Sequence, residues 1–98
     1  MKMSDKQSGV VIDVDVLSIS ILGNPYNVIL FNDDHHDMLE VTSQIIKATN
    51  CSATKAASIM SEAHTTGRAV VFTGGLERAE LVESILAEIK LGTAIEPA

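Results

Sequence analysis

The chain has 98 residues, which is enough for one small domain with a single hydrophobic core. It carries 13 acidic and 7 basic residues, a formal net charge of −6, and no cluster of Lys and Arg that could neutralise phosphates. Together with an aromatic content of 3%, this argues against a nucleic-acid-binding protein. The negative charge instead favours cationic ligands or basic protein surfaces as partners.

The single cysteine, Cys51, cannot form an internal disulfide, which indicates a reducing compartment. The chain does not open with a basic segment followed by an apolar one, and no apolar stretch approaches the roughly 18–20 residues of a membrane span. We therefore expect a cytoplasmic protein with no membrane partner.

Residues 1–9 are polar and predict a disordered tail. Residues 10–22 alternate apolar with Asp or Ser, and the phase of the alternation shifts at residue 17, which predicts a β-like extension. One strand with a bulge or two short strands would explain the shift. The extension would either cover a sheet edge or pair with another chain, so a homodimer through residues 10–22 is one hypothesis.

Residues 26–31 follow a Gly-Asn-Pro turn and form a short apolar run, which predicts a central strand. Asp37 stands three residues before Glu40, the spacing of a capping box, and apolar residues then recur at helical intervals. A helix over residues 38–49 is expected. A break at 50–52 separates it from the next element.

Ser52 can cap a second helix that ends at Gly67. Its predicted inward stripe is Ala53, Ala56, Ala57, Met60, Ala63 and His64. The pattern then predicts a strand over 68–72, a tight link over 73–75, a third helix over 76–91 that stops at Gly92, and a final short strand over 93–95. The third helix should turn inward Ala79, Val82, Ile85, Leu86 and Ile89.

This order of elements predicts an α+β fold: a small antiparallel sheet of three or four strands with three helices packed on one face. Residues 23–98 form the expected domain.

Polar side chains follow the predicted end of the central strand. Asn32, Asp33 and His64 offer an amide oxygen, a carboxylate and an imidazole, the acceptors that an ammonium group needs.

Other interpretations of these residues stay open. The Asn-Asp-Asp run at 32–34 could form a turn and satisfy local backbone donors, and His64 could serve its own helix end. A metal site would draw on Asp33, Asp34, His35, His36 and Asp37, but consecutive residues project in different directions, so neither a metal site nor a cofactor is expected. Hydrolysis by Asp33 and His64 lacks a nucleophile motif, so we expect no enzymatic activity.

The chain resembles the ClpS family of bacterial adaptors from about residue 25 to residue 97. The resemblance is carried by Tyr26-Asn27-Val28-Ile29-Leu30, Asn32-Asp33-Asp34, Met38, Ile59-Met60, His64, Gly67-Arg68-Ala69-Val70 and Ile95-Glu96-Pro97-Ala98. It implies a ClpS-like α/β sandwich that recognises N-degrons, the destabilising N-terminal residues of the N-end rule. Such an adaptor hands their bearers to a ClpA-like or ClpC-like AAA+ unfoldase and protease.

The resemblance also implies roles for individual residues. Asn32, Asp33 and His64 would hold the α-amino group of a substrate whose first residue is Leu, Phe, Tyr or Trp. The side-chain pocket would be formed by Met38 as gate and by Val41, Met60, Ala63 and Leu91 as walls, and Asp34 and His36 would form its rim. His36 and Asp37 depart from the family, which commonly has Thr and Pro there, and Ala63 replaces a larger aliphatic residue.

Overall fold

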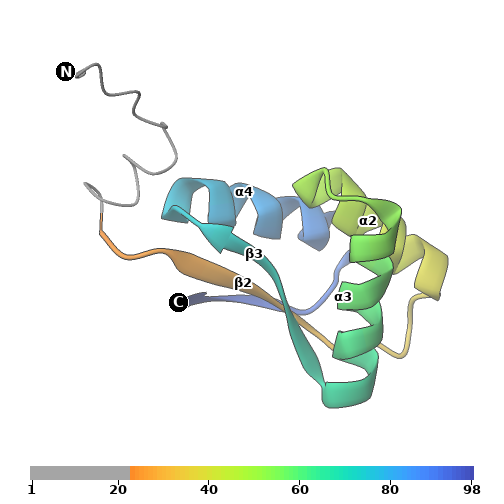
Figure 1. The fold of residues 1–98 in the computed structure, drawn as a ribbon. Helices are drawn as coiled ribbons and strands as arrows, with labels where there is room; N and C mark the ends of the chain where they lie inside the picture. Colours follow the sequence, from red (N-terminus) through yellow and green to blue (C-terminus); the bar gives the residue numbers. More distant parts are fainter. Residues whose placement is uncertain (1–22) are drawn as a thin grey trace.

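The computed structural model describes residues 23–98, which form three antiparallel strands and three α-helices (Figure 1). Strand β2 (Tyr26–Phe31) lies at the centre of the sheet, between β3 (Arg68–Gly74) and β4 (Thr93–Pro97). The predicted α+β fold and central strand are therefore confirmed. The tail predicted for residues 1–9 and the extension predicted for residues 10–22 lie outside the described residues.

Helix α2 (Met38–Thr49) begins and ends where the sequence predicts. The carboxylate of Asp37 accepts a hydrogen bond from the backbone N–H of Glu40 at 2.8 Å and caps the first turn. Asn50 ends the helix in the left-handed conformation, with φ of 59°. Among residues 23–98, none of the helices combines the length and hydropathy needed to cross a bilayer.

Helix α3 (Ala53–Thr66) also has its predicted bounds, but its buried face is rotated from the predicted one. Its buried residues are Ala56, Ile59 and Ala63, whereas Ala53 and Ala57 are exposed. A branched Ile releases more apolar surface from water than an alanine does, so the helix turns Ile59 toward the core. Gly67 ends the helix with φ of 97°.

The third predicted helix is shorter in the structure and is followed by a separate turn. Helix α4 (Leu76–Leu86) is followed by the 3₁₀ helix η1 (Ala87–Ile89), so one continuous helix to residue 91 was a wrong prediction. The chain reverses at Lys90, which has φ of 63° and donates its N–H to the Ala87 carbonyl at 2.9 Å. Thr73 and Gly74 belong to β3 rather than to a link.

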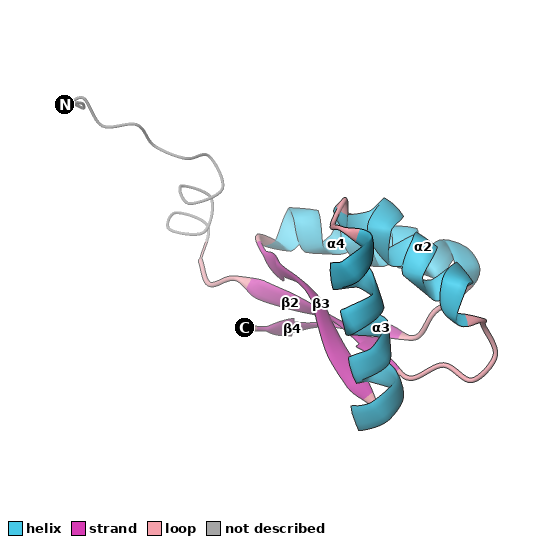
Figure 2. Ribbon diagram, turned by 45° about the vertical axis from the view of Figure 1, so that its right-hand side comes forward, coloured by secondary structure: helices cyan, strands magenta, loops and turns pink. Residues whose placement is uncertain are grey.

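The core lies between the sheet and the three helices, which pack on one face of the sheet (Figure 2). Val28 and Leu30 of β2 point into this core, and Ile29 points to the opposite face because side chains alternate along a strand. On that opposite face, Arg68 of β3 reaches Glu96 of β4 at 2.7 Å. The central strand is thus buried against the helices on one side, and the Arg68–Glu96 ion pair spans its other side.

Candidate functional site

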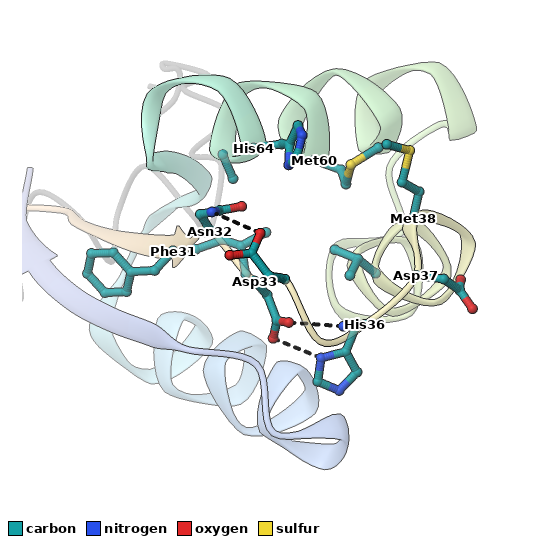
Figure 3. A pocket seen from close by; sticks show the side chains of 12 residues that line it. Phe31, Asn32, Asp33, His36, Asp37, Met38, Met60 and His64 are labelled. Atoms are coloured by element: carbon teal, nitrogen blue, oxygen red, sulfur yellow. Dashed lines mark hydrogen bonds and ion pairs between the residues drawn. The ribbon is translucent and has the colours of Figure 1, made fainter.

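A cavity of about 340 Å³ opens at the point where β2 ends. Its walls come from the end of β2, the loop over residues 32–37, the start of α2 and the second half of α3 (Figure 3). The residues that line it are Leu30, Phe31, Asn32, Asp33, Asp34, His36, Asp37, Met38, Val41, Met60, Ala63 and His64. The fold therefore brings together all of the predicted site residues except Leu91.

A backbone hydrogen bond joins the strand end and the helix end that border this cavity. The N–H of Asn32, the first residue after β2, donates to the carbonyl of Gly67 at 3.0 Å. Gly67 closes α3, and the exposed His64 lies in the last turn of that helix. The strand end and the helix end therefore meet, and Figure 3 shows Asn32 and His64 on the same side of the cavity.

The other side of the cavity is apolar. Val41 and Ala63 are 6% and 3% exposed and form part of its wall. The thioether side chains of Met38 and Met60 extend toward each other at the end of the cavity away from Asn32 (Figure 3). Met38 is 59% exposed, which suits a residue at the entrance of the cavity.

Leu91, predicted as a further wall residue, lies elsewhere in the structure. It is 5% exposed and belongs to the hydrophobic core, and it does not line the cavity. Its N–H bonds to the Leu86 carbonyl at 3.4 Å after the reversal at Lys90, which turns the apolar side chain inward. The sequence pattern could not show this turn, because it predicted a continuous helix there.

Asp33 is the most extensively bonded side chain of the loop. Its Oδ1 accepts the backbone N–H groups of His35 at 2.6 Å and His36 at 3.0 Å, and its Oδ2 lies 2.8 Å from Nδ1 of His36. The turn-forming role considered from the sequence is therefore present. Burial raises the pKa of Asp33, but these hydrogen bonds, led by the His35 N–H, outweigh burial and leave the pKa below its usual value.

His36 is the partner of this carboxylate, a pairing that the sequence did not reveal. The hydrogen bond to Asp33 raises the pKa of His36 above its usual value of 6.5, although partial burial acts in the opposite direction. The charge of Glu40 and the Ile89 carbonyl add to the upward shift. Asp34 is exposed, and its Oδ1 accepts from the Asn32 side-chain amide at 3.4 Å.

The arrangement suits recognition rather than covalent chemistry. Anionic and neutral oxygen acceptors lie at one end of the cavity and apolar side chains at the other, and Ser, Thr and Cys are absent from its lining. Among residues 23–98, no three His, Cys, Asp or Glu side chains come together as potential metal ligands. A ligand with a cationic group beside an apolar group is complementary to this cavity.

Comparison with known proteins agrees with this description. The family model described as ATP-dependent Clp protease adaptor protein ClpS matches residues 23–90. Two curated relatives, the ATP-dependent Clp protease adapter proteins ClpS of Gloeobacter violaceus and Synechococcus elongatus, are 40% and 39% identical over 73 and 74 residues. These alignments cover 74% of this chain and 78% and 77% of the relatives.

Among solved structures, Agrobacterium tumefaciens ClpS2 bound to L-phenylalaninamide superposes with a TM-score of 0.72 and 26% identity. The superposition covers 76% of this chain and 98% of that one. The overall fold and the sequence matches therefore agree. This chain belongs to the ClpS family of Clp protease adaptor proteins.

Proposed function

We propose that this adaptor binds proteins with bulky hydrophobic N-terminal residues and delivers them to a ClpA-like or ClpC-like AAA+ unfoldase without catalysing a reaction. The observation that supports this most strongly is the cavity with hydrogen-bond acceptors at one end and an apolar wall at the other. The relative bound to L-phenylalaninamide points the same way, because that ligand carries a free amino group beside an aromatic side chain.

In this proposal, Asn32, Asp33 and His64 accept hydrogen bonds from the α-ammonium group of the substrate. The first side chain enters between Met38, Val41, Met60 and Ala63. Charge-assisted hydrogen bonds contribute about 1.5–3 kcal/mol each, and burial of a Leu or Phe side chain contributes about 1.5–3 kcal/mol more. After the cost of association, we expect a binding free energy of about −8 kcal/mol, which corresponds to a dissociation constant in the micromolar range.

The cavity volume limits the class of first residue. A volume of about 340 Å³ lies at the lower end of the range for small-molecule sites, so it suits one side chain and its ammonium group. Leu, Phe, Tyr and Trp are the expected first residues, because they are unbranched at Cβ where the chain passes the Met38 gate.

The test is a titration of the chain with two peptides that differ at one group. A Phe-first peptide should bind, and the same peptide acetylated at its N-terminus should bind at least about tenfold more weakly, since acetylation removes the charged donor. Equal affinity for the two peptides would exclude the proposed function.

A second candidate is an interaction domain that dimerises through residues 10–22. It is favoured by the sheet, because β3 and β4 each have one edge without a strand partner among residues 23–98. Light scattering distinguishes the two proposals. A dimer that becomes a monomer when residues 1–22 are removed, with no binding of Phe-first peptides, would support the second candidate.

A further inference from the structure

The hydrogen-bonded pair of His36 and Asp33 lies at the cavity, and the predicted roles of the two residues did not include this contact. Both residues line the cavity, and their side chains are 20% and 13% exposed. Figure 3 shows the imidazole turned toward the Asp33 carboxylate. A partly buried pair of this kind is less screened by solvent than a surface pair.

The bonding of Asp33 leaves limited room for another donor. Each carboxylate oxygen has two lone pairs, and Oδ1 already accepts the N–H groups of His35 and His36. Oδ2 accepts from the His36 ring, which leaves it one further position. An incoming ammonium group must therefore share Oδ2 with the imidazole.

The charge of His36 decides how the two donors share this oxygen. A neutral imidazole that donates through Nδ1 fixes the orientation of the carboxylate and leaves its negative charge available. A protonated imidazole forms an ion pair with the same carboxylate and repels a second cation.

Charged and polar groups from three directions act on His36. Asp33 faces it from its own loop, Glu40 acts on it from the start of α2, and the Ile89 carbonyl acts on it from η1. Together they raise the pKa of His36 above 6.5. Glu88 of η1 is already bound by Lys47 at 2.7 Å and Gln44 at 3.0 Å, and His64 borders the cavity from α3.

We propose that His36 is a positioning residue of the ammonium site, orienting Oδ2 of Asp33 when neutral and competing with the substrate for that oxygen when protonated. This inference rests on the proposed binding of an α-ammonium group. The affinity for the peptide should therefore be high above the pKa of His36 and fall as the pH drops through that pKa. By linkage, bound peptide lowers the pKa of His36.

The test uses the full chain and a Phe-first peptide labelled at its C-terminus, titrated by fluorescence anisotropy from about pH 7.5 to about pH 5.5. The peptide amine is mostly charged at the upper pH and becomes fully charged as the pH falls, because its ordinary pKa is about 8, so its own titration cannot weaken binding at low pH. The wild-type affinity should fall by about 5- to 150-fold, the range expected for coupled sites. The informative quantity is the difference between the wild type and the variants.

His36→Asn keeps a donor near the position of Nδ1 but has no imidazole that can be protonated, so its affinity should depend less on pH than that of wild type. His36→Ala should bind more weakly at the upper pH, and the Asn variant should rescue this loss. His35→Asn is the matched control, because His35 is exposed and contacts Asp33 through its backbone N–H. It should behave as wild type.

Nuclear magnetic resonance of the His36 ring gives an independent measurement, and saturating peptide should lower its titration midpoint. Identical pH profiles for wild type and His36→Asn, or an unchanged midpoint, would overturn the inference while leaving the proposed function intact. Loss of all preference for the free amine over the acetylated peptide at the upper pH would overturn both.

Discussion

Replacing Asp33 by Asn tests the ammonium site with little disturbance of the loop. The amide oxygen of Asn can still accept the backbone N–H groups that Asp33 holds at 2.6 and 3.0 Å. The substitution therefore removes the negative charge and preserves the turn. Asp33→Ala is less informative, because it would also leave both of these N–H groups without their acceptor.

The expected effect can be worked from the structure. The Asp33 side chain is 13% exposed, so a contact with an ammonium group is largely shielded from water. A hydrogen bond to a charged group contributes about 1.5–3 kcal/mol, and about 1.4 kcal/mol corresponds to a factor of ten in affinity. Asp33→Asn should thus weaken binding of a Phe-first peptide by about 10- to 150-fold.

The measurement is fluorescence anisotropy near pH 7.5, with circular dichroism to check the fold. Asp37→Asn is the control, because Asp37 also lines the cavity and Asn caps a helix as well as Asp does. This variant removes the same charge from the same loop. If the two variants weaken binding equally, or if Asp34→Asn weakens it more than Asp33→Asn, the assignment of Asp33 as the acceptor is refuted.

Three further predictions concern the gate, the helix packing and the end of α3. Met38→Ala should widen the entrance and raise the affinity for Ile-first relative to Phe-first peptides; an unchanged ratio in the same titration would contradict the gate. Gln44→Ala should destabilise the fold by about 1–3 kcal/mol in urea, because the Ile85 carbonyl and the Glu88 carboxylate lose the buried amide that donates to them. Lys47→Ala, which alters an exposed contact to the same glutamate, should be nearly neutral. Gly67→Ala should lower the free energy of unfolding by about 1–2 kcal/mol because φ is 97°, although no atom within 4 Å obstructs a Cβ. Gly75→Ala, with φ of −63° and equal space, should lower it less in the same assay.

Local signals in the sequence were sufficient for most of the elements. Asp37 and Ser52 cap the helices that they were predicted to cap, and Gly67 ends α3 in the left-handed conformation. These signals act between residues that are close in sequence, so they do not depend on tertiary contacts.

Two features could not be predicted because they depend on packing. The alanines of α3 carry little apolar surface, so the sequence did not determine which face of the helix turns inward. In the structure, Ile59 lies in the core and defines that face. The reversal at residues 87–90 uses Lys90 in the left-handed conformation, whereas the sequence favoured Gly92 as the stop.

The candidate site also has features that the sequence predicts and features that depend on the folded structure. Its position at the end of the central strand follows from the order of the elements, and the cavity contains the predicted Asn32, Asp33 and His64. The bond between His36 and Asp33 follows from side-chain directions within an irregular loop. Residue spacing determines such directions in helices and strands, but not in loops.

The hydrogen bond from Asn32 to Gly67 holds the end of β2 against the end of α3 in the chain without a ligand. In the proposed function, binding of a peptide would therefore cost little backbone entropy at this end of the cavity. The thioether chains of Met38 and Met60, which are flexible, would adapt to first residues of different shape. Selectivity and plasticity would thus belong to opposite ends of one cavity, and hydrogen exchange at the Asn32 amide should stay slow with or without peptide.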